Sequence, residues 1–257
     1  MKHKIGIVLS GGGHRGAAHA GILKAMEEFD LQPDILSGAS AGAVVGALYA
    51  AGHSPKIILE AFKSIKLFSV SYFARGKAGF LDSERFEKFL TSYFPKNQFE
   101  ALDKTLKITA TDLVKGEKRV FDKGEVIPAI LASAAVPGIF TPVKIENSLY
   151  ADGGVLDNFP VTPLQENTID IYGSYVCPLK TLTVRDFKHS YNVADRALQL
   201  MMHNNSVQKF KDCKLVFSSD SLESFGLFKT GQTDRIYQIG YDTASRSLEK
   251  YLKARSL

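Results

Sequence analysis

The sequence predicts an α/β protein with a mainly parallel sheet, and three observations near its start lead to that fold class. Residues 4–9 form a continuous apolar run, which is typical of a strand buried on both faces. A glycine-rich loop follows, and then a helix whose apolar positions recur at helical spacing up to Phe29. A second strand-like run begins at Asp34, so the segment forms a βαβ unit whose two strands are parallel.

The composition is that of one globular domain. The 257 residues are 45% hydrophobic, which is enough for a sizeable core, and we expect a single domain over residues 1–257. Strand-like residues begin almost at the first position, so no signal peptide is predicted, and no apolar run reaches the roughly 18 residues that span a bilayer. The two cysteines, Cys177 and Cys213, fit neither a disulfide nor a zinc pattern and are expected to be buried thiols.

These features predict a cytoplasmic protein that is soluble or peripheral at a membrane. The net charge of +5 and the isoelectric point near 9.0 suit anionic lipid or simple solubility, and charge by itself identifies no partner. We predict no nucleic-acid partner, no cofactor and no metal.

The loop after the first strand, Ser10–Gly16, has two interpretations. Gly11, Gly13 and Gly16 match the G-x-G-x-x-G pattern of dinucleotide-binding loops. That pattern requires an acidic residue at the end of the second strand to hold a ribose, and here Asp34 stands at its start. The other interpretation is an oxyanion hole, in which backbone N–H groups point at the negative charge that develops beside a nucleophile.

A nucleophilic serine is predicted directly after the second strand. Ser40 is the centre of Gly38-Ala39-Ser40-Ala41-Gly42, between the strand and an Ala-rich helical run at residues 43–51. A sharp strand-to-helix turn pushes its central residue toward positive φ and needs small residues two before and two after it. Gly38 and Gly42 supply that clearance, and the helix N-terminus favours negative charge near the hydroxyl. This turn and the glycine loop both lie at the carboxyl edge of the sheet, where open α/β sheets place their sites.

Further elements follow along the chain. Residues 62–80 mix aromatic side chains with lysine and arginine, which fits a membrane-facing or pocket-covering segment or a helical cap over the core. Two hairpins are expected, at residues 107–121 with a turn at Lys115-Gly116, and at residues 143–151. Strands are also expected at residues 169–176 and 214–217, and helices after Ser54, after Ser83 and over residues 127–133, 192–210 and 235–253.

The base that serves Ser40 is predicted to be a carboxylate. None of the six histidines stands at a convincing position for the usual serine–histidine pair. Asp152 precedes Gly153-Gly154 at the end of the second hairpin, a sequence that by default forms a turn. A carboxylate at a strand end, freed by two glycines, can also reach the catalytic edge, and partial burial would raise its pKa as a base requires.

Four ordered blocks of the sequence closely resemble the patatin-like phospholipase family. The blocks are Gly11–Gly16, Gly38–Gly42, Ala132–Pro137 and Asp152-Gly153-Gly154, the last followed by Asn158 and Pro160. The similarity covers roughly residues 4–164, and we find no family motif from residue 165 onward, where the chain is expected to complete the scaffold. Four blocks in order are far more specific than any one of them.

The resemblance implies a three-layer α/β/α fold and calcium-independent cleavage of acyl esters of phospholipids or related lipids. Carried over to this sequence, it makes Ser40 the nucleophile and Asp152 the base. It also makes the N–H groups of Gly12 and Gly13, with Arg15 nearby, the oxyanion hole. The remaining motif glycines support these residues: Gly11, Gly16, Gly38, Gly42, Gly153 and Gly154.

Three alternatives remain open on the sequence. An acyltransferase would form the same acyl-enzyme and pass the acyl group to an acceptor other than water. A nucleotide-binding module would use the glycine loop without chemistry at Ser40. Within the hydrolase, Arg15 could contact a lipid phosphate instead of the oxyanion. The substrate is expected to be a phospholipid or another acyl ester, with peripheral membrane contact possible and the oligomeric state unknown.

Overall fold

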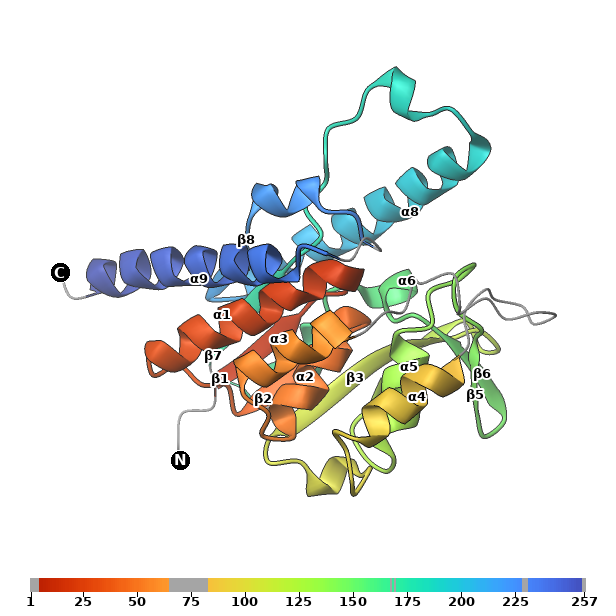
Figure 1. Ribbon diagram of the computed structural model, residues 1–257, viewed down its shortest axis with the longest axis horizontal. Coiled ribbons are helices and arrows are strands. Elements are labelled where there is room, and N and C mark those ends of the chain that lie inside the picture. Colours follow the sequence, from red (N-terminus) through yellow and green to blue (C-terminus); the bar gives the residue numbers. More distant parts are fainter. Residues whose placement is uncertain (1–4, 65–82, 167, 169, 228–230, 256–257) are drawn as a thin grey trace.

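The computed structural model describes residues 5–64, 83–166, 168, 170–227 and 231–255. Within them, one eight-stranded sheet has the order β5-β6-β3-β2-β1-β7-β8, with β4 on the other edge of β3 (Figure 1). The strands are β1 Ile5–Leu9, β2 Ile35–Ala39, β3 Thr105–Asp112, β4 Glu117–Phe121, β5 Val143–Ile145, β6 Ser148–Ala151, β7 Asp170–Tyr175 and β8 Leu215–Ser218. The pairs β1–β2, β1–β7, β2–β3 and β7–β8 are parallel, which confirms the βαβ unit and the mainly parallel sheet.

The longer helices lie where the sequence predicts them. They are α1 Ala17–Glu28, α2 Ala41–Ala50, α3 Pro55–Ser64, α4 Ser83–Thr91, α5 Val126–Ser133, α6 Gly154–Asp157, α7 Thr162–Gln165, α8 Ser190–Val207 and α9 Thr233–Arg255. The short helices α6 and α7 follow Asp152 closely and were not predicted. Both predicted hairpins, β3–β4 and β5–β6, are confirmed.

Helices cover both faces of the sheet, and this confirms the three-layer fold. Along β1, Ile7 and Leu9 point into the larger core, which they share with α1, α2, α3, α5 and α9. Val8 between them points to the opposite face and joins a smaller core with Phe159 and Leu164, around α6 and α7. The continuous apolar run of β1 is thus buried on both sides, as parallel strands between helices are.

The last helix, α9, lies directly against α1 (Figure 1). A Cβ added to Gly21 of α1 would lie 2.1 Å from the Tyr237 carbonyl oxygen, and one added to Gly240 of α9 would lie 2.1 Å from the Ala18 carbonyl oxygen. The two backbones therefore touch, because each helix presents a glycine to the other. Through α9, β7 and β8, the C-terminal part of the chain joins the same sheet and core.

One edge of β3 brings two distant segments together. β2 pairs with the first part of β3 and ends at Ala39, opposite Thr109. β4 occupies the opposite edge of β3. β6 pairs with the last two residues of β3 and therefore lies on the same edge as β2. β6 runs antiparallel to β3 and ends at Ala151. The residues that come next in the two strands, Ser40 and Asp152, therefore meet.

A segment that we call the arm, residues 180–201, projects from the body of the molecule (Figure 1). The chain runs outward after β7, makes the 3₁₀ turn η4 Val184–Asp186 and returns along α8. The C-terminal half of α8 is tied to the body, where Asn205 donates a hydrogen bond of 3.2 Å to the Leu156 carbonyl oxygen. Just beyond α8, the ammonium of Lys209 lies 2.6 Å from the carboxylate of Asp157.

Among the described residues, no helix is both long enough and apolar enough to cross a bilayer. The predicted aromatic and cationic segment at residues 62–80 lies, apart from its first three residues, outside the described part of the chain. Phe62 at the end of α3 is buried in the larger core. The two cysteines are free and partly buried, and burial raises the pKa of the Cys213 thiol to about 12.

Candidate active site

Ser40 occupies a strained turn between β2 and α2. Its φ of 52° and ψ of −122° lie in a region that residues other than glycine rarely adopt. A Cβ on Gly42 would lie 2.1 Å from the Leu9 carbonyl oxygen, and one on Gly38 would lie 2.5 Å from the Gly42 carbonyl oxygen. The turn can therefore form only with glycine at these positions, and it places Ser40 at the N-terminal end of α2, where the helix dipole favours negative charge.

The structure brings Ser40 and Asp152 into direct contact. The Ser40 hydroxyl donates a hydrogen bond of 2.5 Å to Oδ2 of Asp152. The other carboxylate oxygen, Oδ1, accepts a bond of 2.7 Å from the Gly154 N–H. Ser133 supports the turn, since its hydroxyl accepts a bond of 2.9 Å from the Ser40 N–H and donates one of 2.7 Å to the Thr109 carbonyl oxygen. Hydrogen bonds from Ser40 and Gly154 thus fix both carboxylate oxygens of Asp152.

Burial shifts the proton affinity of Asp152. The side chain is 5% exposed, and removal from water raises its pKa from 3.8 to about 6. The hydrogen bonds from Ser40 and Gly154 favour the ionised form and act in the opposite direction. The carboxylate is consequently ionised near neutral pH yet basic enough to accept a proton.

The glycine loop lies beside Ser40 with free backbone donors. Among the described residues, no acceptor is bound to the N–H groups of Gly12 and Gly13. Gly13 has a φ of 54°, and a Cβ there would lie 2.3 Å from the Leu227 carbonyl oxygen. A Cβ on Gly11 would lie 3.2 Å from Cβ of Ser40, so the loop backbone passes directly beside the serine. The arrangement can hold negative charge through backbone N–H groups.

Each supporting glycine of the motifs packs so closely against a neighbour that a side chain would not fit. An added Cβ would come within 3.0 Å of a neighbouring atom at each of Gly11, Gly16, Gly38, Gly42, Gly153 and Gly154. At Gly153 the neighbour is the Thr109 carbonyl oxygen, at 2.1 Å, which fixes the loop of Asp152 to the end of β2 and β3.

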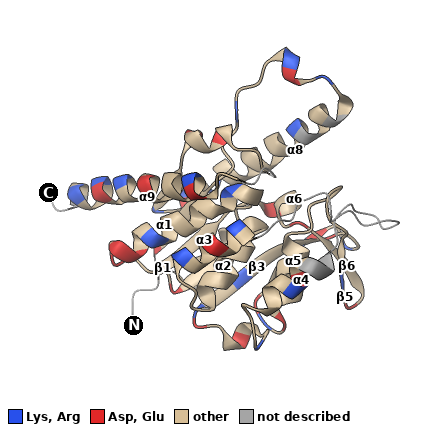
Figure 2. Cartoon of the chain, viewed as in Figure 1, with Lys and Arg blue, Asp and Glu red and all other residues tan. Residues whose placement is uncertain are grey.

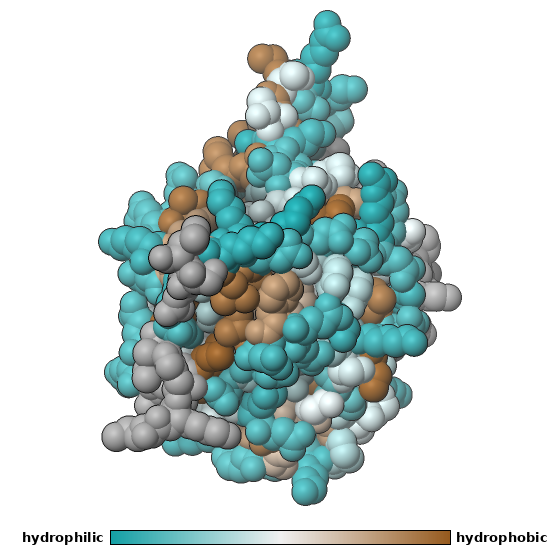
Figure 3. Space-filling model, turned by 90° about the vertical axis from the view of Figure 1, so that its left-hand side faces the viewer, coloured by the Kyte–Doolittle hydropathy of each residue, from teal (hydrophilic) through white to brown (hydrophobic). Residues whose placement is uncertain are grey.

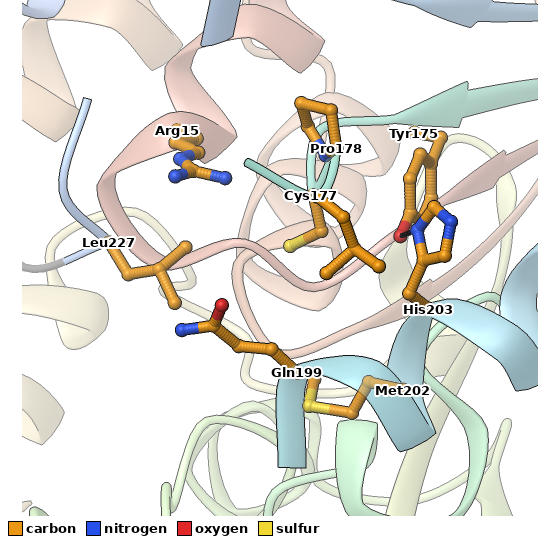
Figure 4. A pocket seen from close by; sticks show the side chains of 9 residues that line it. Arg15, Tyr175, Cys177, Pro178, Gln199, Met202, His203 and Leu227 are labelled. Atoms are coloured by element: carbon orange, nitrogen blue, oxygen red, sulfur yellow. Dashed lines mark hydrogen bonds between the residues drawn. The ribbon is translucent and has the colours of Figure 1, made fainter. Parts of the chain in front are cut away.

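The backbone N–H of Arg15 is not free, so it does not join the free N–H groups of Gly12 and Gly13 beside Ser40. Its N–H donates to the Gly12 carbonyl oxygen at 3.1 Å, and its guanidinium Nε donates to the Phe225 carbonyl oxygen at 2.8 Å. Burial lowers the pKa of the guanidinium, which nevertheless remains charged. The side chain points into a small cavity of about 50 Å³ that also contacts Cys177 and Gln199 (Figure 4).

A larger cavity of about 140 Å³ opens at Ser40, Asp152 and the two donor glycines. Most of its other lining is apolar: Val136, Pro137, Ile139, Val155, Leu198, Met202 and Leu227. Cavities that enclose a whole drug-sized ligand occupy roughly 300–1,000 Å³. This one therefore accommodates part of an apolar chain next to the serine. It shares Cys177, Gln199, Met202 and Leu227 with the Arg15 cavity, so the two adjoin.

Asn158 belongs to the site in a way that the sequence did not reveal. The sequence placed Asn158 in the last family block and gave it no role. In the structure Asn158 lines the larger cavity, it is 1% exposed, and neither oxygen nor nitrogen of its amide has a hydrogen-bond partner. The neighbouring Cys177 thiol is only a weak hydrogen-bonding group, so it does not satisfy the Asn158 amide. Burial raises the pKa of that thiol to about 11. The signal in the sequence was the place of Asn158 in the family block.

The histidines do not supply a base within the described structure. His19 is fully buried, and its ring contacts the Ser174 hydroxyl at 2.5 Å and the Ser10 carbonyl oxygen at 2.9 Å. Desolvation lowers the pKa of His19 to about 4, so the ring is neutral. His14 contacts the Thr233 hydroxyl at 3.0 Å. In the described part of the chain, no three His, Cys, Asp or Glu side chains converge as a metal site requires.

The chain is similar to known proteins over most of its length. Residues 7–164 match the family described as Patatin-like phospholipase. Lysophospholipase NTE1 of Pyricularia oryzae is 27% identical over 277 aligned residues, which cover 96% of this chain and 18% of that protein. An uncharacterized NTE family protein of Mycobacterium tuberculosis, Rv1063c, is 32% identical over 174 residues, which cover 65% of this chain and 47% of that protein.

Two solved structures share the fold. VipD from Legionella pneumophila has a TM-score of 0.60 at 16% identity, over 97% of this chain and 67% of that one. The type III effector ExoU of Pseudomonas aeruginosa has a TM-score of 0.51 at 18% identity, over 96% of this chain and 53% of that one. The chain spans less than half of the length of the curated relatives named above. Since the family match covers more than half of this chain, the chain belongs to the patatin-like phospholipase family.

Proposed function

We propose that this protein is a serine lipid acyl hydrolase in which Ser40 is the nucleophile and Asp152 the general base. The observation that carries the proposal is the 2.5 Å hydrogen bond from the Ser40 hydroxyl to a buried carboxylate whose pKa is raised to about 6. The free N–H groups of Gly12 and Gly13 and the apolar cavity support it. Family membership and the lysophospholipase relatives favour lipid esters as the substrate class.

The proposed reaction has two halves. In the first, Oγ of Ser40 attacks the ester carbonyl carbon while its proton passes to Oδ2 of Asp152, and the Gly12 and Gly13 N–H groups hold the oxyanion. The bond to the alcohol then breaks, and the alcohol leaves with the proton from Asp152. In the second half, water attacks the acyl carbonyl carbon and gives its proton to Asp152. The bond to Oγ then breaks, Oγ of Ser40 takes that proton back from Asp152, and the fatty acid leaves.

Fluorophosphonate labelling followed by intact-mass measurement tests the nucleophile before any substrate is known. We expect one adduct on the wild type and none on Ser40→Ala. Ser37→Ala is a matched control, because Ser37 is a buried serine of β2, the strand that leads to Ser40, and its hydroxyl donates to the Pro160 carbonyl oxygen, away from the dyad. Loss of labelling in the control, or retained labelling in Ser40→Ala, would contradict the assignment.

Substrate class is tested with single-chain lysophospholipids and short-chain neutral esters. We expect Ser40→Ala to abolish hydrolysis of both and Asp152→Asn to lower it by about 10²-fold or more. Products are analysed with and without added alcohol acceptors, because an acyltransferase would form new esters instead of free fatty acid. Free fatty acid as the main product in both cases is the expected result.

Arg15 is proposed to contact the phosphate of a phospholipid, since its half-buried guanidinium lines the small cavity that adjoins the cavity of Ser40, and its N–H is already bonded. Arg15→Ala should therefore reduce turnover of phosphate-bearing esters more than turnover of neutral esters. Equal losses on the two ester types would speak against a phosphate contact.

A further inference from the structure

The arm exposes a row of apolar side chains to solvent. Val193, Ala197, Leu200 and Met201 are all exposed and stand at i, i+4, i+7 and i+8 on α8, which places them on one side of the helix. Met201 is 69% exposed. At the outer end of the arm, Val184 is 90% exposed and Phe187 is also exposed. Figure 3 shows brown and pale residues among hydrophilic ones on the projecting part.

The opposite side of the same helix forms a wall of the active-site cavity. Leu198, Gln199 and Met202 line the cavity that contains Ser40. They lie about half a turn around α8 from the exposed apolar row. A surface that binds the exposed apolar row therefore lies one helix width away from the cavity that contains Ser40.

The arm carries more cationic than acidic side chains. Residues 180–200 include Lys180, Arg185, Lys188 and Arg196 against two aspartates. The first three are exposed, and Figure 2 shows charged residues on the outer turn of the arm. Asp186, the acidic residue of that turn, is engaged in hydrogen bonds with the backbone and hydroxyl of Thr183. Apolar side chains bordered by cations match the interface of a bilayer that contains anionic lipid.

We infer that the arm docks the protein on an anionic lipid surface, with the outer row of α8 and the η4 turn in the interface. The purpose of this contact rests on the proposed function: it would hold the cavity wall of α8 against the layer that contains the acyl esters. This surface is formed by residues other than 62–80, the segment in which the sequence suggested membrane contact. The arm projects instead of forming a groove, and such a shape inserts into a lipid layer more readily than it accommodates a folded partner.

Vesicle co-sedimentation of the full chain tests the inference. The probes are phosphatidylcholine vesicles with and without phosphatidylglycerol. We expect binding mainly to the anionic vesicles and less binding at higher salt. Met201→Glu and Val184→Glu should each weaken it about tenfold or more, because each replaces an inserted apolar side chain with a charge. Arg185→Gln and Lys188→Gln should weaken it about fivefold each.

The matched control is Val114→Glu. Val114 is 66% exposed in the turn between β3 and β4, so the variant makes the same change at similar exposure away from the arm. Its binding to anionic vesicles should equal that of the wild type. Because Val184 and Met201 are both largely exposed, their variants should keep the wild-type melting temperature. Equal binding by the wild type and the two arm variants would overturn the inference.

Further measurements separate this inference from the proposed function. The arm variants should retain fluorophosphonate labelling and hydrolysis of a water-soluble ester, and lose hydrolysis of vesicle lipid. Ser40→Ala should bind anionic vesicles as the wild type does, even though it is inactive. If no serine is labelled but binding still depends on Met201, the proposed function fails and the docking surface stands. If the wild type is a dimer that Met201→Glu dissociates, without dependence of vesicle binding on the arm, a second copy covers the surface and the inference is wrong.

Discussion

Asp152 sets the expected pH dependence of the reaction at the scale of a single residue. In the proposed mechanism its carboxylate must be ionised to accept the Ser40 proton, and its pKa is raised to about 6 by burial. We expect the fluorophosphonate labelling rate to be constant at about pH 7–8 and to fall tenfold per unit well below pH 6. A labelling rate that does not change between about pH 5 and pH 8 would contradict the role of Asp152 as base.

The same carboxylate affects the free energy of unfolding. Because its pKa is higher in the folded than in the unfolded chain, Asp152 contributes most stability below about pH 4 and loses that contribution as pH rises through about 6. A shift from 3.8 to about 6 corresponds to roughly 3 kcal/mol. Asp152→Asn should therefore be more stable than the wild type at pH 8 by up to about this amount. Urea unfolding at pH 8 and pH 4.5 checks this, and the difference should be much smaller at the lower pH.

Asn158 allows a structural role to be distinguished from a functional one. An unpaired buried amide costs roughly 1–3 kcal/mol, so Asn158→Leu should leave the melting temperature unchanged or raise it. If the amide contacts substrate or water in the cavity, the same change should lower kcat by about tenfold or more. Loss of stability with unchanged kcat per folded molecule would show that Asn158 serves packing alone.

Sequence motifs predicted individual residues better than their interactions. Ser40 and Asp152 were singled out because the elbow and the Asp-Gly-Gly block are local patterns, and the structure brings the two side chains into contact, while their catalytic roles stay predictions. The hydrogen bond from the Arg15 guanidinium to the Phe225 carbonyl oxygen and the unpaired amide of Asn158 depend on how the glycine loop folds against Phe225, Leu227 and Cys177. These residues lie far away in the sequence, and no local pattern records such contacts.

At the scale of elements, the glycines of the elbow and of the α1–α9 contact are expected to be irreplaceable. Gly42→Ala and Gly240→Ala would each place a Cβ 2.1 Å from a carbonyl oxygen, which only a backbone shift can relieve. Each should lower the free energy of unfolding by at least about 2 kcal/mol. Gly46→Ala is the control, because its Cβ would meet only side-chain atoms at 3.3 Å or more, and alanine favours the helix. Urea unfolding of the three variants should rank Gly46→Ala as the most stable.

The sequence predicted the helices and strands themselves better than it predicted which of them lie side by side. The apolar runs and turn residues predicted all eight strands of the described sheet, including the two hairpins. That β2 and β6 share one edge of β3 depends on long-range pairing and the position of β4, and no strand sequence specifies its neighbour. The short helices α6 and α7 were missed because four residues are too few to show a period.

For the molecule as a whole, the buried carboxylate of Asp157 joins three parts of the chain. It lies at the end of α6, and its oxygens are 2.8 Å from the Lys118 ammonium on β4 and 2.6 Å from the Lys209 ammonium beyond α8. The Asp157 side chain is 4% exposed, whereas the lysines are 34% and 23% exposed. The cluster therefore anchors both the loop of Asp152 and the base of the arm to strand β4.

Removal of Asp157 should destabilise the whole fold. Breaking a fully buried ion pair costs roughly 3–5 kcal/mol, and since both lysines reach water, we expect about 2–3 kcal/mol for Asp157→Ala in urea unfolding. The triple variant Asp157→Leu, Lys118→Met and Lys209→Met should recover most of that loss, because no charge is left unpaired. Lys24→Met, which breaks the exposed pair with Glu28, should not change the unfolding midpoint measurably. If Asp157→Ala unfolds at the wild-type midpoint, the cluster adds nothing net to stability, and the packing of α6 against α8 must hold the base of the arm.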